Sequence, residues 1–223
     1  LIGDKMQTTP DSAKSNVRAR LLQAAVRLFS EQGVAGTTVA EIAQRAGVTS
    51  AMVHYYFKTK DQLLDAVVAE KLIGEFIAFV SGALDRGGTE PVALVEGLVW
   101  RIVEASEAMP WLPPLWVREV ISEGGALRDK LIRRVDLRKQ EQFKALVAAA
   151  QKAGRLNPGL NPQLLFMSIV ALTMLPLSMA KSWDRIPLIG RVSKQDLGRH
   201  VVALLKHGLA AASGPAKPKG RHP

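Results

Sequence analysis

The chain has no cysteine among its 223 residues. It therefore forms no disulfide and supplies neither a thiolate nucleophile nor a cysteine-ligated zinc site. Aromatic residues are also few, with two Tyr, six Phe and four Trp, so we expect a core made mainly of Leu, Val, Ala and Ile. The lack of cysteine fits a reducing compartment, and we expect a cytoplasmic protein.

The signatures of common enzyme classes are missing as well. The sequence contains no His-Glu-x-x-His, no glycine-rich phosphate loop and no Gly-x-Ser-x-Gly. Only four histidines occur, and His200 and His207 lie two helical turns apart, which makes them a poor pair of metal ligands. We therefore expect no catalytic residue, no metal and no cofactor.

Strand signals are absent, because the chain has no alternating β-branched and aromatic runs and no Asn-Gly hairpin. Nearly every segment has helical periodicity instead, which predicts an all-α fold of about nine helices. The expected helices span about 16–32, 39–46, 50–57, 60–86, 90–107, a short piece before 124, 126–152, 162–182 and 194–212. The expected organisation is a flexible start (1–14), a three-helix domain (15–60), a larger helical domain (61–212) and a disordered basic tail (213–223).

Charge is uneven along the chain. The net charge is +10 and the pI is about 10.1, which favours a polyanionic partner. Residues 128–155, however, carry nine Lys or Arg against three Asp or Glu, whereas residues 1–65 carry eight against six. The basic segment 126–152 is expected to be a solvated helix face, so net charge alone is a weak argument for DNA binding.

One segment calls for a membrane test. The run from Leu164 to Ala180 is 17 residues without a charge, at the lower limit for a spanning helix, and it contains Pro176. A helix in the core or at a subunit interface is the better interpretation, so we expect no membrane contact.

The segment Thr37–Leu63 predicts a helix-turn-helix. Thr38 and Glu41 form a Thr-x-x-Glu capping box, and Thr49 caps the following helix. Gly47 between the two helices is free to adopt a positive φ, as a tight turn requires. Such short helices are marginal alone, so the first helix is expected to brace them.

Helical geometry also predicts which side chains of the second short helix face outward. With Val53 and Phe57 pointing inward, small and hydrogen-bonding side chains face a partner, which suits a DNA groove. The expected contacts on this surface are Thr49, Ser50, Ala51, Met52, His54 and Tyr55. Lys60, Arg18 and Arg20 are expected to neutralise phosphates. The alternative is that His54 is a plain surface histidine and that Tyr55 and Tyr56 both belong to the core.

The motifs "AAVRLFSEQG", "TTVAEIAQRAGV" and "YYFKTKDQLL" occur here in order and at the expected spacing. Together they resemble the N-terminal domain of the tetracycline-repressor (TetR) family over residues 17–67. The resemblance implies a homodimer that binds a double-stranded DNA operator and is released by a small-molecule effector. By position it implies that Thr38, Thr49, Ser50, Met52, His54, Tyr55 and Lys60 face DNA. Many relatives have a basic residue and a glycine where this chain has Ser50 and Ala51, so the operator sequence is not carried over.

The C-terminal two-thirds is expected to hold the dimer interface and the effector site. Paired reading helices must lie about 34–36 Å apart, and the apolar segments 162–182 and 194–212 are the expected interface; closure of a monomer core is the alternative. The expected ligand contacts are Trp100, Trp111, Trp116, Arg118, Phe143, Phe166 and Met167, although aromatic residues at helical spacing are more often core. A lipophilic or aromatic effector is favoured.

These observations predict a ligand-responsive repressor that binds a palindromic operator as a homodimer. The alternative is a helical small-molecule-binding or membrane-surface protein without sequence-specific DNA binding.

Overall fold

The computed structural model describes residues 10–86, 90–185, 187 and 192–210. Within these ranges the chain contains no β-strand, only an isolated bridge between Leu156 and Ala210, so the all-α prediction is confirmed. The parts of the expected flexible start before residue 10 and the expected tail at 213–223 lie outside the described residues.

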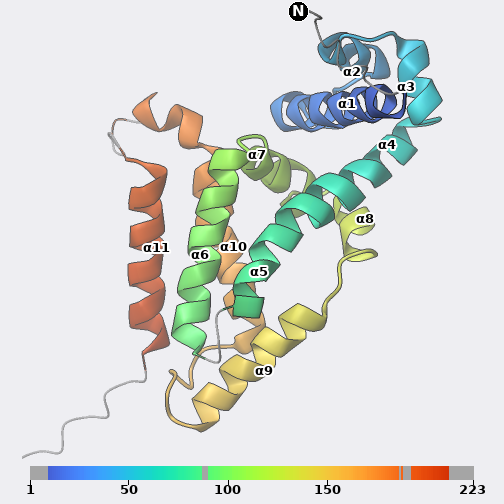
Figure 1. Ribbon diagram of the computed structural model, residues 1–223. Helices are drawn as coiled ribbons and strands as arrows, with labels where there is room; N and C mark the ends of the chain where they lie inside the picture. Colours follow the sequence, from blue (N-terminus) through green and yellow to red (C-terminus); the bar gives the residue numbers. More distant parts are fainter. Residues whose placement is uncertain (1–9, 87–89, 186, 188–191, 211–223) are drawn as a thin grey trace, which may run out of the picture.

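The first three helices form a separate bundle, called the head below. It consists of α1 (Pro10–Gln32), α2 (Val39–Ala46) and α3 (Ser50–Tyr56), which lie together at one end of the molecule (Figure 1). Leu21, Leu28 and Phe29 of α1 are buried, so α1 braces the two short helices as the sequence predicts. The helix begins at Pro10 rather than at about residue 16, so the helical part includes residues expected to be flexible.

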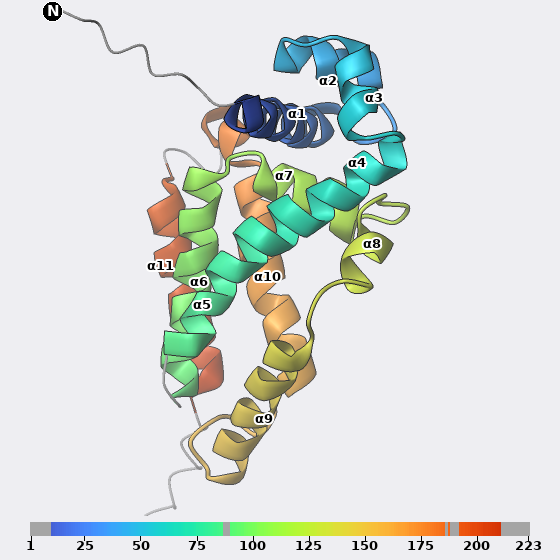
Figure 2. The ribbon, with the colours of Figure 1, turned by 45° about the vertical axis from the view of Figure 1, so that its right-hand side comes forward.

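One long helical run connects the head to the rest of the chain. It is built from α4 (Lys60–Ala66), a π-helical stretch η1 (Val67–Ile77) and α5 (Ala78–Arg86), which follow one another without a break. The run crosses diagonally from the head over the larger domain (Figures 1 and 2). It therefore contacts both domains, and the expected helix from residue 60 to 86 is confirmed.

The larger domain, called the body below, packs around α10 (Pro162–Ser178). Its other elements are α6 (Pro91–Ala108), α7 (Leu112–Trp116), η2 (Val117–Ile121), α8 (Arg128–Ile132), α9 (Arg138–Lys152), the 3₁₀ turn η3 (Ala180–Arg185) and α11 (Lys194–Leu209). Helices α6, α10 and α11 lie side by side (Figure 2). The caps expected at Asn161 and Ser193 are present.

The basic helix expected at 126–152 is divided in two. Helix α8 ends at Ile132, a turn follows, and α9 begins at Arg138. Asp136 explains why a new helix starts here. Its carboxylate accepts a hydrogen bond from the Arg138 N–H (3.0 Å), which is one of the unpaired donors in the first turn of α9. The Arg138 guanidinium also bonds this carboxylate and is the main reason that the pKa of Asp136 falls to about 2.

The apolar run of α10 is accounted for without a membrane. Among the described helices, α10 included, none combines the length and apolarity that a bilayer crossing requires. Leu165, Ile169, Met174 and Leu177 are buried against the body, as expected for a core helix.

Candidate nucleic-acid interface and effector cavity

Helices α2 and α3 are held in a helix-turn-helix by local hydrogen bonds. Thr38 Oγ1 accepts from the Glu41 N–H (3.2 Å), and Glu41 Oε2 accepts from the Thr38 N–H (2.7 Å). Gly47 has φ +66°, and Thr49 Oγ1 accepts from the Met52 N–H at 3.4 Å. The predicted caps and turn are therefore confirmed.

The outer face of α3 is exposed and uncharged. Val53 and Phe57 are buried, whereas Ser50, Ala51 and His54 lie on the open side. The predicted orientation of this helix is therefore confirmed. Thr38 and Thr49 are also exposed, and Met52 is half-buried at the edge.

Tyr55 is the most prominent side chain of this face. It is 67% exposed, so it lies outside the core. Its ring stands edge-on to Tyr56, with centroids 5.1 Å apart, which positions the phenol at the surface.

The basic residues expected to meet phosphates have partners within the protein. Lys60 Nζ donates to the carbonyl oxygens of Val34 and Thr37, each at 2.6 Å, and so holds the α1–α2 loop. Arg18 makes a two-bond ion pair with Glu70, at 2.6 and 2.5 Å, which raises the pKa of the guanidinium.

Arg18 also lies 5.2 Å from the centre of the Phe57 ring, so it joins α1 to the connecting helix. Arg20 bonds the carbonyl oxygens of Ala46 and Gly47 at the end of α2. These three cations are part of the scaffold that positions α3.

Lys58 is a basic residue that the sequence reasoning passed over. It lies two residues after the end of α3, its side chain is exposed, and no ion pair to it is found within the described part of the chain. Its N–H donates to Gln62 Oε1 at 3.1 Å, which fixes the backbone beside the open face of α3. The signal was present in the motif "YYFKTKDQLL", where the first lysine stands between α3 and α4.

A buried carboxylate connects the body to the head. Glu119 of η2 is 6% exposed, and its Oε1 accepts from the Val34 N–H (2.8 Å) in the α1–α2 loop. Its Oε2 accepts from the Ala126 N–H at 3.0 Å. Gly33 precedes this contact with φ +82°, and a Cβ there would lie 3.2 Å from Glu119 Oε1. The loop and η2 are thus in close contact.

A second connection joins α8 to the start of the long helical run. Lys130 Nζ lies 2.6 Å from Asp61 and 2.9 Å from Asp65, and Arg134 lies 3.1 Å from Asp65. The hydrogen bond to Asp61 is the largest cause of the raised pKa of Lys130, and Lys130 in turn lowers the pKa of Asp65. Asp61 and Asp65 belong to α4, directly after the head.

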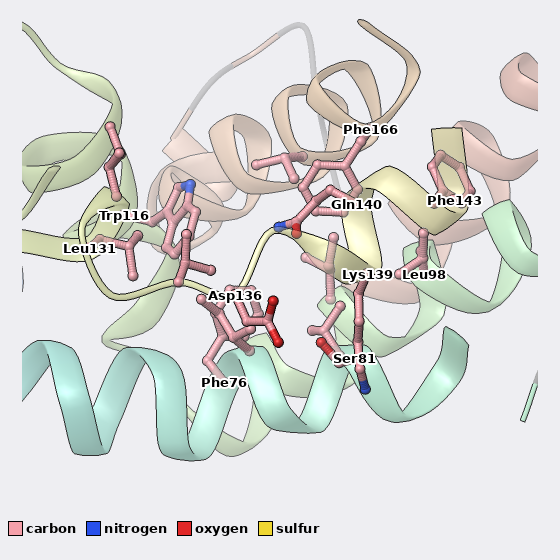
Figure 3. Close-up of a pocket in the computed structure, with 16 residues that line it drawn as sticks. Phe76, Ser81, Leu98, Trp116, Leu131, Asp136, Lys139, Gln140, Phe143 and Phe166 are labelled. Carbon is pink, nitrogen blue, oxygen red and sulfur yellow. The ribbon is translucent and has the colours of Figure 1, made fainter. Parts of the chain in front are cut away.

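An apolar cavity of about 180 Å³ lies in the body beside this second connection (Figure 3). Two edge-on aromatic pairs contribute to its lining: Phe76 with Trp116 (centroids 5.3 Å apart) and Phe143 with Phe166 (6.5 Å). Its polar lining residues are Ser81, Asp136, Lys139 and Gln140. The cavity thus offers mostly apolar contacts with a few polar groups, as small-molecule sites do.

Three of the seven expected ligand residues line this cavity, namely Trp116, Phe143 and Phe166. The other four do not. Trp100 packs between α6 and α11, where a Cβ on Gly198 would lie 2.7 Å from its ring.

Trp111 is buried in the core at 7% exposure, and Arg118 donates to the Glu31 carbonyl (3.2 Å) at the head. Met167 is 64% exposed on the outer side of α10. Helical spacing does not distinguish these positions, because each side of a buried helix faces a different neighbour.

The sequence reasoning also missed one wall of the cavity. The segment from Leu131 to Gln140, expected to be a solvated helix face, contributes lining residues because the turn between α8 and α9 directs them inward. Asp136, whose carboxylate accepts from the Arg138 N–H at the start of α9, is the sequence signal that could have revealed this turn.

Helix α10 also carries an uncovered apolar face. Leu164, Met167, Leu175 and Met179 are exposed along it, and Leu204 is exposed on the neighbouring α11. These five residues are called the apolar stripe below. Large contiguous apolar patches are rare on the surfaces of monomeric soluble proteins.

The fold and the head define a class: a helix-turn-helix protein whose larger helical domain encloses an apolar cavity. Comparison with known proteins gives the family. Residues 21–67 match the model of bacterial regulatory proteins, tetR family. The chain is 31% identical over 165 residues to the HTH-type transcriptional regulator RutR of Escherichia coli (strain K12), covering 72% of this chain and 74% of RutR. It therefore belongs to the tetR family.

Two further comparisons agree. The chain is 27% identical over 203 residues to the HTH-type transcriptional repressor KstR2 of Rhodococcus jostii (strain RHA1), covering 90% of this chain and 94% of KstR2. The solved structure of the ketosteroid transcriptional regulator KstR2 of Mycobacterium tuberculosis is similar with a TM-score of 0.65 at 21% identity, covering 86% of this chain and 94% of that one.

Family membership confirms the resemblance and the functional class. The findings support a ligand-responsive DNA-binding transcriptional regulator rather than an enzyme. Members usually act as dimers that bind DNA operators and small-molecule effectors. The alternative of a membrane-surface or ligand-storing protein without specific DNA binding is therefore disfavoured.

Proposed function

We propose that the chain is a homodimeric repressor whose α3 reads the major groove of a palindromic operator. The observation that carries this proposal is the exposed, uncharged face of α3 on a head whose neighbouring cations are engaged in holding it in place. Small side chains allow close approach, and Tyr55 and His54 offer hydrogen bonds to base edges or phosphates. The proposed DNA contacts are Thr38, Thr49, Ser50, Ala51, Met52, His54 and Tyr55. A repressor must reach the chromosome, so we place its action in the cytoplasm.

In this proposal Lys58, rather than Lys60 or Arg18, supplies the phosphate contact next to α3. Lys58 is exposed without an ion pair among the described residues, whereas Lys60 is bonded to the α1–α2 loop and Arg18 is bonded to Glu70 of η1. A free ammonium releases condensed counterions when it meets a phosphate, which makes its contribution dependent on salt.

The apolar stripe of α10 and α11 is the proposed dimer interface. Exposed leucines and methionines in one row favour burial against a second copy of the same surface. A twofold axis through this stripe would place two heads on one side of the dimer, as an inverted-repeat operator requires.

The cavity in the body is the proposed effector site. Two routes connect its walls to the head: Trp116 continues into η2, where Glu119 bonds the α1–α2 loop, and Leu131 lies beside Lys130, which bonds α4. An effector that binds more tightly when these contacts are shifted would weaken operator binding, because only differential affinity moves an equilibrium. A tenfold effect on operator affinity corresponds to about 1.4 kcal/mol of coupling.

Footprinting of genomic fragments, followed by gel-shift titration of the protected site, tests this function. We expect an inverted repeat, and we expect Tyr55→Ala to weaken binding by about 1–3 kcal/mol. Gln142→Ala is the control, since Gln142 is exposed on α9, far from the head in Figure 1. Operator binding by Tyr55→Ala that equals wild type, or protection without any inverted repeat, would contradict the proposal.

A further inference from the structure

One polar atom in the cavity wall has no partner. Gln140 Oε1 is buried, and within the described part of the chain it is the one buried side-chain nitrogen or oxygen that lacks a hydrogen bond. Gln140 lies in the first turn of α9, and Figure 3 shows its amide directed among the lining side chains between Trp116 and Phe166. Folded proteins rarely leave such an atom unpaired, so each case requires a reason.

No described side chain around this oxygen donates a hydrogen bond to it. Besides Gln140, the lining residues with donor side chains are Ser81, Trp116 and Lys139. Figure 3 shows the Lys139 ammonium at the Ser81 end of the cavity, away from the Gln140 amide. The cavity is enclosed largely by apolar side chains, including the two aromatic pairs. The nearby carboxylate of Asp136 is an acceptor like Gln140 Oε1, and it is already bonded by Arg138. An amide oxygen accepts hydrogen bonds only, so the missing partner must be a donor.

We propose that Gln140 Oε1 accepts a hydrogen bond from the effector and so determines which molecules the cavity takes. The corresponding ligand class is an uncharged, ring-containing apolar molecule with an N–H or O–H donor. The rings match the two aromatic pairs, which favour edge-on and offset contacts. A carboxylate directed at this oxygen is disfavoured, because it would bring a second acceptor and lose its own hydration. This inference rests on the proposed function only in taking the cavity as the effector site.

Indole and benzofuran provide a matched pair of probes, because the two bicycles have the same shape and differ by an N–H donor in one and an oxygen in the other. Their dissociation constants are measured by isothermal titration calorimetry on the full chain without DNA. For wild type we expect indole to bind about tenfold more tightly than benzofuran, the size of one buried hydrogen bond.

Two variants assign this preference to a residue. Gln140→Leu removes the acceptor, and we expect it to bind the two probes equally well. Gln142→Leu makes the same change two residues further along α9, where the side chain is exposed, and we expect the wild-type preference to remain. Circular dichroism confirms folding, and Gln140→Met takes the place of Gln140→Leu if the latter does not fold.

Three results would overturn the inference: equal binding of both probes by wild type, an undiminished preference in the Gln140 variant, or no saturable binding of either probe. Gel shift with the footprinted site separates this question from the proposed function. The Gln140 variant should bind operator like wild type when no probe is present. A wild-type chain that prefers indole but binds no operator would contradict the function alone, whereas operator binding without an indole preference would contradict this inference alone.

Discussion

The head and the body differ in how many of their polar groups are hydrogen-bonded, and how many of their apolar side chains are buried, within a single chain. In the head, polar groups are paired over short distances: Thr38 with Glu41, Thr49 with the Met52 N–H, and Lys60 with two loop carbonyls. In the body, Gln140 Oε1 is buried without a partner, and Leu175 and the rest of the apolar stripe are exposed.

This difference indicates that the two regions do different work. A reading helix must be held rigidly before it meets DNA, because a misplaced contact loses specificity. The proposed function requires the body to bind a ligand and a second copy of the chain, so the body must keep a cavity and a surface available for them. The variants below disrupt first the body, then its contact with the head, and finally the lysines beside α3, in order of decreasing expected effect.

A charge in the apolar stripe is expected to have the largest effect. Leu175→Asp places a carboxylate on an exposed position of α10, so it should leave the monomer folded while preventing two stripes from packing together. One head alone then meets one half-site, and operator affinity should fall by about a hundredfold or more. Sedimentation velocity measures the oligomeric state, and gel shift measures the affinity.

The matched control is Ala145→Asp, which adds the same charge to an exposed position on α9. It should remain dimeric and bind operator like wild type. A Leu175→Asp protein that sediments as a dimer would show that the interface lies elsewhere.

Removing the carboxylate that joins body and head is expected to have the next largest effect. Glu119→Ala leaves the Val34 and Ala126 N–H groups without their acceptor, and the first of these contacts is buried while the second is half-buried. We expect a loss of about 2 kcal/mol in the free energy of unfolding, measured by urea denaturation. We also expect the affinity for operator to respond less to any effector, because one of the two routes to the head is lost.

Glu123→Ala controls for the loss of a negative charge. Glu123 is exposed just after η2, and its replacement should change stability by less than about 0.5 kcal/mol. Equal stability of the two variants would mean that the Glu119 contact contributes nothing measurable.

The contrast between head and body also explains which features could be predicted from the sequence. The head was predictable to the level of caps, turn and outward face, because its signals are local: Thr-x-x-Glu, Gly47 at positive φ, and helical spacing. The site in the body was predictable only in part. Trp116 and Trp100 both lie among apolar neighbours in the sequence, yet Trp116 lines the cavity and Trp100 packs on Gly198. That distinction depends on which helices meet in space.

The two lysines that follow α3 show that residue type and position in the sequence do not identify a phosphate contact. Lys58 and Lys60 are two residues apart and identical in type, and the sequence favoured Lys60 as the phosphate contact. Lys60 Nζ instead bonds the Val34 and Thr37 carbonyls, with Thr37 itself buried. A contact with DNA and a contact with a loop carbonyl draw on the same chemistry, so residue type cannot separate them.

Salt dependence separates the two lysines, and it is expected to show the smallest effect. Each phosphate contact adds about 0.9 to the slope of log affinity against log salt. Lys58→Ala, present twice in a dimer, should therefore reduce the magnitude of this slope by about 2 and leave the free energy of unfolding unchanged. Lys60→Ala should show the opposite pattern, because it removes two hydrogen bonds between α4 and the α1–α2 loop: a loss of about 1–2 kcal/mol in stability with little change in slope. Gel-shift titrations at four salt concentrations, together with urea denaturation of both variants, measure the two quantities. If Lys60→Ala flattened the salt slope and Lys58→Ala did not, Lys60 would be the phosphate contact after all, and its bonds to the loop would have to open when DNA binds.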